Sequence, residues 1–221
     1  EPAGMTTIGL SYSLVKISTK CAPALLFRGV SDSTHKLIPS LFRHTALDSK
    51  DNAADTLENS MMWLFKTSAK AFIKKTPDSE VEWLVIGQHH GLPTRILDWS
   101  LSPLVACFFA VHSLSETDAA IYIYDPQEFH REENIILSDL NKIIAFIPSH
   151  ASPRVTAQSG MFTLHPSNQV ELNGDHITKL IIPKSIKKEM LRRLVKYGIH
   201  HGTIFPDLDG LSKYIKYLKG Y

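Results

Sequence analysis

The sequence predicts a single α+β domain in which a helical N-terminal half packs on a mixed, mainly antiparallel sheet. Apolar residues recur at helical spacing before about residue 112, and the spacing shifts toward strand-like alternation after it. Grouping of helices before strands favours α+β over the regular alternation of a doubly wound sheet. No internal repeat, low-complexity tract or flexible linker divides the 221 residues, so we expect one domain over residues 1–221.

Composition narrows the class of protein. The chain is 43% hydrophobic and 21% charged, close to the average for globular proteins. Its 24 Lys and Arg nearly balance its 22 Asp and Glu, which disfavours a protein that binds nucleic acid through its overall field. No apolar run approaches the roughly 20 residues of a membrane span, and the first residues lack the features of a signal peptide. We therefore expect a cytoplasmic protein without a membrane partner.

The cysteines and histidines do not form metal-binding patterns. Cys21 and Cys107 have no CxxC spacing, so both are interpreted as reduced, structural thiols. The eleven histidines include adjacent pairs at 89–90 and 200–201. Neighbours in a helix point about 100° apart and do not pre-form a metal site. We expect no bound metal.

The first half of the chain predicts one strand and three helices. Ser102 and Pro103 are typical of an N-cap and a first-turn proline, so a buried helix should begin there. Leu104, Phe108 and Phe109 recur on that helix at spacings near four and should lie in the core. The expected elements are a strand at 24–30 and helices at 54–75, 80–90 and 102–111.

The second half predicts mostly strands. Its apolar segments are short, strand-like, and ended by Pro or Asp. Gly198 should stop one amphipathic helix, and Asp207 or Asp209 should begin the last. The expected strands are 119–125, 142–148, 160–166, 177–183 and 203–205, and the expected helices are 185–196 and about 207–218.

Three polar clusters adjoin these elements and are the candidate binding residues. An arginine inside a strand is unusual unless it is paired, and the glycine after Arg28 lets a ligand approach the backbone. Three arginines, at 28, 95 and 154, would capture phosphate oxygens if they converge, without a Gly-rich phosphate loop, which the sequence lacks. Phe27 or Trp99 would stack on an aromatic ring, or would lie in the core. The clusters are Phe27, Arg28 and Gly29; Gln88, His89, Thr94, Arg95, Asp98, Trp99 and Ser100; and Arg154, Gln158 and Ser159.

A purely structural interpretation of each cluster stays open. Arg28 would then be an edge arginine in a salt bridge, and Asp98 would cap the next helix while pairing with Arg95. The third cluster would be an ordinary loop. The spacing of Arg193 and His200 is also found in some helical ribonucleases, although Gly198 between them should end the helix.

Four segments, 25–43, 88–110, 154–162 and 198–211, resemble the FRG domain family, which is named for its Phe-Arg-Gly and found mainly in bacteria and phages. The resemblance runs from about Leu25 to the C-terminus.

The order of motifs also resembles arginine-type ADP-ribosyltransferases, which implies an ADP-ribosyltransferase-like fold. In that family, an arginine on the first strand holds NAD, a serine positions the nicotinamide side, and a glutamate drives transfer. The matching positions are Arg28, Ser100 and Gln158. Gln158 cannot offer a carboxylate's charge, so Asp98 is the candidate to stabilise the ribosyl cation.

The resemblances imply a nucleotide-binding domain that acts as an NAD-dependent ADP-ribosyltransferase or NAD-cleaving enzyme, in a bacterial toxin or phage-defence setting. NAD would be its substrate, and a protein or nucleic acid its acceptor. The alternatives are a non-catalytic module that recognises a phosphorylated ligand, nucleic acid or phage component, and a nuclease. The expected catalytic residues are Arg28, Asp98, Ser100 and Gln158, and the expected ligand-binding residues are Phe27, Gly29, Gln88, His89, Thr94, Arg95, Trp99 and Arg154.

Overall fold

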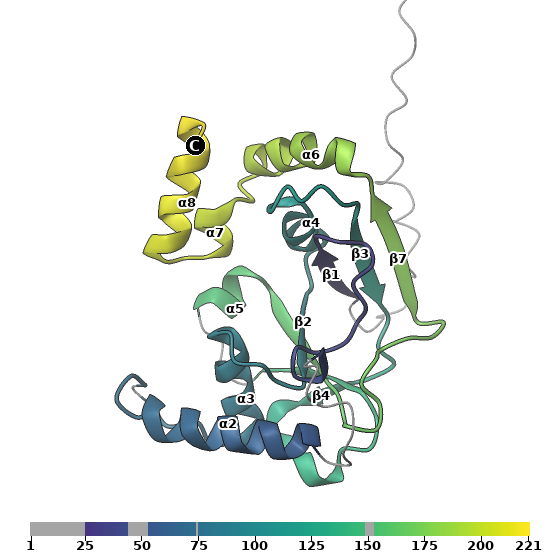
Figure 1. Cartoon of the computed structure of the whole chain (residues 1–221), viewed down its shortest axis with the longest axis vertical. Helices are drawn as coiled ribbons and strands as arrows, with labels where there is room; N and C mark the ends of the chain where they lie inside the picture. The colour runs from purple at the N-terminus through teal and green to yellow at the C-terminus, as the bar shows by residue number, and fades with distance from the viewer. Residues whose placement is uncertain (1–24, 44–52, 74, 149–152) are drawn as a thin grey trace, which may run out of the picture.

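A seven-stranded sheet with the order β4-β5-β6-β2-β1-β3-β7 forms the centre of the protein (Figure 1). The computed structural model describes residues 25–43, 53–73, 75–148 and 153–221. Neighbouring strands are antiparallel except β4 and β5, which are parallel, so the predicted mixed, mainly antiparallel sheet is confirmed. The strands are β1 (Leu26–Val30), β2 (Ile96–Ser100), β3 (Ala119–Tyr124), β4 (Phe129–Arg131), β5 (Ile144–Ile147), β6 (Gly160–Leu164) and β7 (Ile177–Ile182).

The sheet narrows to one residue pair between β1 and β2. β1 pairs with β3 along its whole length, from Leu26 to Val30. It pairs with β2 only through Phe27 and Ser100, whereas β2 pairs with β6 over five residues. The sheet therefore consists of two well-paired halves that part beyond the Phe27–Ser100 pair.

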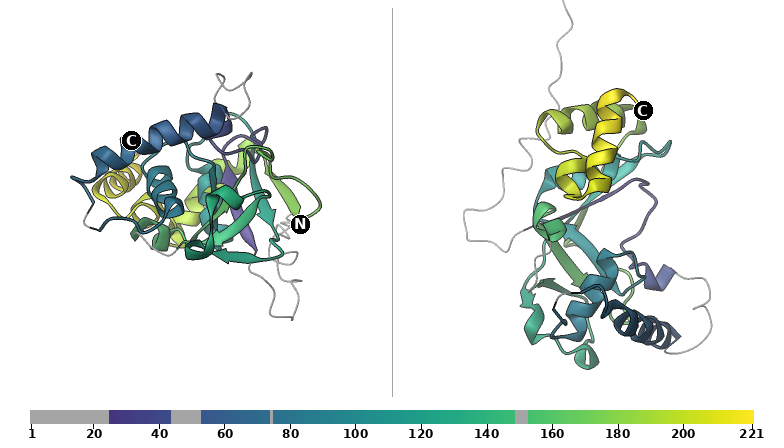
Figure 2. Two further views of the ribbon diagram at one scale, coloured as in Figure 1. Left: turned by 90° about the horizontal axis from the view of Figure 1, so that it is seen from below. Right: turned by 90° about the vertical axis from the view of Figure 1, so that its left-hand side faces the viewer.

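Helices gather at the two ends of the molecule. α6, α7 and α8 lie at one end of the long axis, and α2 and α3 lie at the other (Figures 1 and 2). α4 packs on β1 and β3 and contacts α6, whereas α3 contacts α2 and β2. Among the described residues, the α-helices are α2 (Ala53–Ala69), α3 (Glu80–His89), α4 (Pro103–Val111), α5 (Pro153–Ala157), α6 (Lys184–Lys196), α7 (His201–Ile204) and α8 (Leu208–Lys219), with short 3-10 helices η1 (Leu41–Arg43), η3 (Glu132–Asn134) and η4 (Leu137–Asp139).

α4 begins as the sequence predicts and lies unusually close to β1. The Ser102 hydroxyl accepts a hydrogen bond from the Val105 N–H, and proline occupies the first turn. A Cβ on Gly29 would lie 1.8 Å from the carbonyl oxygen of Ala106, so only glycine fits. Glycine is therefore required at position 29 because α4 packs closely against β1 there. From the sequence, Gly29 was instead explained by the approach of a ligand to the backbone.

The expected core of α4 is only partly confirmed. Phe108 is fully buried, whereas Phe109 is half-buried and packs against the same cluster. Leu104 is exposed, because the helix turns Ala106 and Ala110 rather than Leu104 toward β1. The prediction that Leu104 lies in the core is wrong.

Several element predictions need correction. Residues 96–100, expected within a polar turn, form the central strand β2, in which exposed Asp98 alternates with buried Leu97 and Trp99. Residues 203–205 were expected to be a strand, but Thr203 and Ile204 belong to the short helix α7. The Thr203 hydroxyl accepts a hydrogen bond from the N–H of His200, the residue before the helix. β4 and α5 were not predicted. The two helices expected near the end of the chain are confirmed as α6 and α8.

The interpretation of Cys107 as a structural thiol is consistent with its environment, since burial raises its pKa to about 11 and keeps it protonated. Cys21 lies outside the described residues. Within the described ranges, no helix is long and apolar enough to cross a membrane. The same ranges hold no group of three His, Cys, Asp or Glu side chains placed to hold a metal ion.

Candidate functional site

A cavity of about 270 Å³ opens where the two halves of the sheet part. Both strands of the narrow junction contribute to its wall, and so do α3, α4, the segment 154–158 and the residue after α7. We call it the central cavity. Its lining residues are Phe27, Arg28, Gly29, Gln88, His89, Asp98, Trp99, Ser100, Ala106, Phe109, Arg154, Gln158 and Phe205.

The central cavity brings together residues that are far apart in the sequence. All of the expected catalytic and ligand-binding residues line it except Thr94 and Arg95, and Ser159 of the third polar cluster does not line it either. Three lining residues, Ala106, Phe109 and Phe205, were not predicted as site residues. Phe205 carries no chemical signal in the sequence beyond its position in a segment that resembles the FRG family.

Arg28 and Asp98 face each other across the junction. The Arg28 Nη1 donates a hydrogen bond to the backbone carbonyl of Asp98 at 2.6 Å and lies 3.8 Å from its carboxylate Oδ2. Burial lowers the pKa of Arg28 and Asp98 opposes this, but an arginine stays charged at neutral pH. Arg28 is thus salt-bridged, as the structural alternative proposed, but in a central strand rather than at an edge.

A short hydrogen-bond chain orients the Asp98 carboxylate. The Thr94 hydroxyl donates to the Gln88 Oε1 at 2.7 Å. That bond fixes which end of the Gln88 amide is the donor, and its Nε2 donates to the Asp98 Oδ2 at 2.8 Å. Thr94 therefore acts on the central cavity through Gln88 without lining it.

Ser100 and Gln158 tie the walls of the cavity together. The Ser100 hydroxyl donates to the Gln158 carbonyl at 2.6 Å and accepts from the Ser102 N–H at 2.9 Å. The Gln158 Nε2 donates to the carbonyl of Ile204 at 3.2 Å. These bonds link the end of β2 to the segment before β6, and that segment to α7.

Arg154 bridges α3 and the residue that follows α7. Its guanidinium lies 4.5 Å from the centre of the Phe205 ring, a cation–π distance, and its Nη1 donates to the His89 carbonyl at 3.4 Å. Burial, and then the charge of Arg154, lower the pKa of His89. A neutral imidazole and a cation therefore share this wall.

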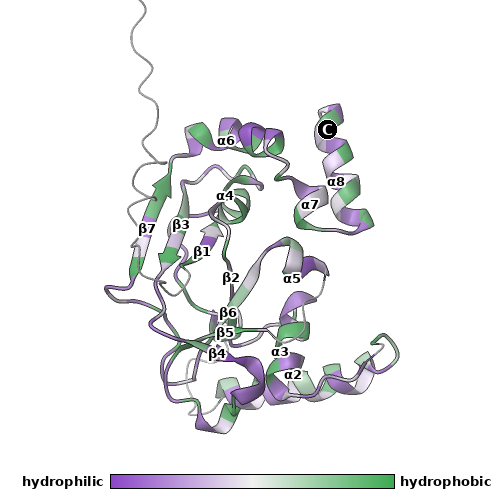
Figure 3. Ribbon diagram, turned by 180° about the vertical axis from the view of Figure 1, so that it is seen from behind, coloured by the Kyte–Doolittle hydropathy of each residue, from purple (hydrophilic) through white to green (hydrophobic). Residues whose placement is uncertain are grey.

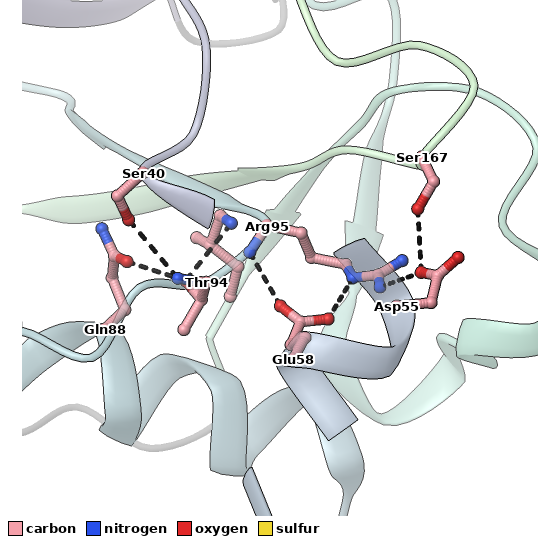
Figure 4. Close-up of polar contacts among 8 residues, drawn as sticks. Ser40, Asp55, Glu58, Gln88, Thr94, Arg95 and Ser167 are labelled. Atoms are coloured by element: carbon pink, nitrogen blue, oxygen red, sulfur yellow. Dashed lines mark hydrogen bonds and ion pairs between the residues drawn. The ribbon is translucent and has the colours of Figure 1, made fainter. Parts of the chain in front are cut away.

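Arg95 belongs to a separate, buried network (Figure 4). The Arg95 guanidinium forms ion pairs with Glu58 and Asp55 of α2. The backbone N–H of Arg95 donates a hydrogen bond to the Glu58 Oε1 at 2.9 Å. Burial alone would lower the pKa of Arg95, but the two carboxylates outweigh burial, and the pKa is raised. The pKa of Glu58 is also raised, mainly because its carboxylate is buried. The expected convergence of Arg95 with Arg28 is wrong, because α2 engages its guanidinium.

The alternative role for Asp98 is also wrong. Ser102 caps α4, and Arg95 pairs with α2, so Asp98 neither caps that helix nor pairs with Arg95. The Arg193 side chain pairs with Glu189, and neither Arg193 nor His200 lines the central cavity.

A chain of hydrogen bonds through Thr163 and His165 fixes the orientation of the Trp99 ring. Its Nε1 donates to the Thr163 hydroxyl at 3.0 Å, and that oxygen lies 3.0 Å from the His165 Nε2. The His165 Nδ1 lies 2.9 Å from the Val170 carbonyl, which can only accept, so Nε2 must accept from Thr163. Burial lowers the pKa of His165 to about 4, which keeps it neutral as this chain requires.

The comparisons with known proteins agree with one of the two resemblances. No match to the chain was found among curated proteins or among solved structures, so the resemblance to ADP-ribosyltransferases stays a prediction. The family model of the FRG domain matches residues 23–119, from β1 to the first residue of β3. Arg154, Gln158 and Phe205, which complete the central cavity, lie beyond that match. The resemblance to the FRG domain family is thus confirmed over residues 23–119.

Proposed function

We propose that the central cavity binds a nucleotide, and that NAD is the ligand to test first. One observation carries the proposal: two arginines and several aromatic rings from distant parts of the chain line the same cavity. Arg28 and Arg154 offer the donors that phosphate oxygens require. Phe109 and Phe205 offer apolar surface for a planar ring.

The size of the cavity limits how much of a ligand it encloses. Ligand pockets commonly span about 300–1,000 Å³. At about 270 Å³ the central cavity lies just below that range, so it suits one ring and its adjoining ribose phosphate. For a dinucleotide such as NAD, we expect one half to lie inside and the other to extend out of the opening.

Asp98 is the residue on which any turnover would depend. When the bond between ribose and nicotinamide breaks, its electron pair leaves with the nicotinamide nitrogen, and the ribose carbon becomes positively charged until water or an acceptor attacks it. A nearby carboxylate stabilises that charge. Asp98 is the carboxylate among the lining residues, and Gln88 and Arg28 hold it in place.

A non-catalytic recognition module is the second candidate, and a specific observation favours it. The Ser100 hydroxyl and the Gln158 Nε2 are both engaged in bonds that hold the walls together. In this function, Arg28, Arg154 and Gln88 would recognise the ligand, and Asp98 would orient Arg28.

Calorimetry with NAD, AMP and inorganic pyrophosphate, alongside mass spectrometry for released nicotinamide, tests the proposal. We expect NAD and AMP to bind more tightly than pyrophosphate, because the rings contribute. Asp98→Asn keeps the size of the side chain but removes its charge, so it should abolish nicotinamide release while retaining binding. The exposed Arg131→Ala, on β4, is the matched control for an arginine outside the cavity. If folded protein binds none of the three ligands, nucleotide binding is refuted; binding without release leaves the recognition module.

A further inference from the structure

α8 presents its apolar side to solvent. Leu208, Leu211, Ile215 and Leu218 follow one another at spacings of three, four and three, which places them on one face of the helix. They are 82%, 47%, 48% and 56% exposed. We call these four residues the α8 stripe. Figure 3 shows hydrophobic and hydrophilic residues alternating along α8 at the edge of the molecule.

The opposite side of α8 makes the contacts that hold it in place. Gly210 is buried, and a Cβ there would lie 2.0 Å from the Phe205 carbonyl oxygen. Tyr217 packs against the core cluster that contains α4. A surface helix ordinarily turns its apolar stripe toward the core. Here the stripe is turned outward, so it contributes less to the core than the opposite side of α8 does.

The end of the molecule that carries α8 is also strongly basic. Residues 183–221 contain nine Lys and Arg and three Asp and Glu, a net charge of +6, whereas the whole chain has +2. One of the nine, Lys187, is buried with its ammonium bonded to Ser31, Ser115 and Thr117. α6, α7 and α8 place this charge at one end of the long axis (Figure 2). The remaining 182 residues carry a net charge of −4.

We propose that the end of the protein formed by α6–α8 binds the surface of an anionic membrane, with the α8 stripe inserted among the lipids. An exposed apolar helix face beside clustered lysines and arginines is the pattern of peripheral membrane binding. Tyr197, exposed at the end of α6, has the amphipathic ring that suits the interface between lipid and water. No membrane partner was predicted from the sequence, because the exposure of the α8 stripe depends on how α8 packs.

The same observations disfavour two other occupants of this end. A second copy of the chain would bring two ends of charge +6 together, and they would repel each other. Nucleic acid would satisfy the basic charge, and the exposed ring of Tyr197 would offer a base a surface for stacking, but the aliphatic α8 stripe would remain in water. An anionic lipid surface accommodates both the charge and the stripe.

Flotation with lipid vesicles tests this inference. We expect the protein to float with vesicles of phosphatidylcholine mixed with phosphatidylglycerol and to remain unbound with phosphatidylcholine alone. Leu211→Gln with Ile215→Gln should weaken binding at least tenfold, since both side chains are exposed and the helix should still form. Lys216→Glu with Lys219→Glu should weaken it by at least about fivefold for each charge. Ile136→Gln and Arg131→Glu are matched controls on exposed residues outside α6–α8 and should bind as the unmodified protein does.

Each other outcome assigns the surface differently. Failure of the unmodified protein to float with anionic vesicles would overturn the proposal, and so would unchanged binding of the Leu211→Gln, Ile215→Gln variant. Sedimentation velocity in the same buffer would reveal a dimer that this variant dissociates, which would assign the stripe to a second copy. Binding of a single-stranded RNA that only the lysine variant loses, without flotation, would assign the basic charge to nucleic acid. Circular dichroism confirms that each variant is folded, and the single change Leu218→Gln near the helix end repeats the test.

Discussion

Arg28 and Arg95 are both strand-associated arginines of the candidate site, yet they lie in opposite environments. Arg28 lines the central cavity and pairs with one carboxylate, that of half-exposed Asp98. Its Nη1 lies 3.8 Å from the Asp98 Oδ2. Arg95 is buried between two carboxylates of α2 and does not line the cavity. Arg28 thus retains donor capacity beside an open space, whereas the donors of Arg95 are directed at the protein itself.

The two arginines differ in where their ion-pair partners lie in the chain. The partners of Arg95 lie 37 and 40 residues earlier in the chain, in a helix whose packing the sequence does not reveal. Asp98, the partner of Arg28, lies 70 residues later, on the other side of the junction in the sheet. An arginine engaged by two carboxylates of a neighbouring helix has its donors committed within the fold, whereas one beside a cavity remains available to a ligand.

Removal of Arg95 from its buried network should reduce stability more than any other change considered below. Arg95→Met should lower the free energy of unfolding by about 3–5 kcal/mol, because Glu58 would be left buried without its partner. Urea denaturation measures the loss. The double change Arg95→Met with Glu58→Met should recover much of it, since no buried charge is then left unpaired, and Asp55, which is about one-third exposed, keeps its hydrogen bond from Ser167. A loss below about 1 kcal/mol for the single variant would contradict the contrast between the two arginines.

Acid should weaken the hydrogen-bond chain that links Trp99 to His165, because His165 would become protonated. The pKa of His165 is lowered to about 4 by burial, and Arg28 adds to this, whereas its unfolded value is near 6.5. The unfolded chain therefore binds more protons between these values. The stabilisation is complete above about pH 6.5 and is lost as pH falls toward 4, by about 3 kcal/mol.

Unfolding measured at several pH values, for the unmodified protein and for His165→Asn, isolates this contribution. The variant should show a shallower loss across the same window. His112, whose pKa burial also lowers to about 4, and His89, whose pKa burial lowers, remain in both proteins and contribute to the residual slope. Equal slopes for the two proteins would place the titration elsewhere.

Arg28→Ala should change ligand affinity much more than stability. We expect the affinity for NAD or AMP to fall at least about tenfold, as one phosphate-binding cation is removed. Stability should fall by only about 1 kcal/mol, since Asp98 is half-exposed and water can solvate it. Calorimetry and urea denaturation measure the two quantities. A large loss of stability with affinity retained would make Arg28 structural, like Arg95.

Much of the fold could be predicted from local patterns. The N-cap at Ser102 and the alternation in the second half located α4 and four of the strands, because these signals lie within a few residues of one another. β2 was not predicted because polar residues surround it in the sequence, although its residues before and after Asp98 are buried. The exposure of Leu104 could not be predicted either, since it depends on which side of α4 packs against β1.

The candidate site was predictable as a set of residues but not as a geometry. The polar clusters at 27–29, 88–100 and 154–158 do converge, because each adjoins one of the elements that meet at the junction. Chemistry alone could not separate Arg95 from Arg28, as both are arginines next to apolar strand residues. Phe205 was missed because an aromatic residue near the chain's end has no chemical signature of its own.

Thr94→Val should have the smallest effect and is the most direct test of how the two regions are divided. Thr94 is fully buried, and valine keeps its shape while removing the hydroxyl that donates to the Gln88 Oε1. The free energy of unfolding should fall by about 1 kcal/mol. Without that donor the Gln88 amide can turn its oxygen toward Asp98, so the affinity for NAD or AMP should fall severalfold.

Ser167→Ala is the matched control for Thr94→Val. The Ser167 hydroxyl donates to Asp55 at 2.8 Å and so belongs to the Arg95 network rather than to the cavity. Its loss should cost a similar free energy of unfolding and leave ligand affinity unchanged. In a double-mutant cycle, Thr94→Val should couple to Gln88→Ala by about 0.5 kcal/mol or more, because the two side chains share a bond. Thr94 and Ser167 variants that altered affinity equally would show that one connected network, rather than two, surrounds the central cavity.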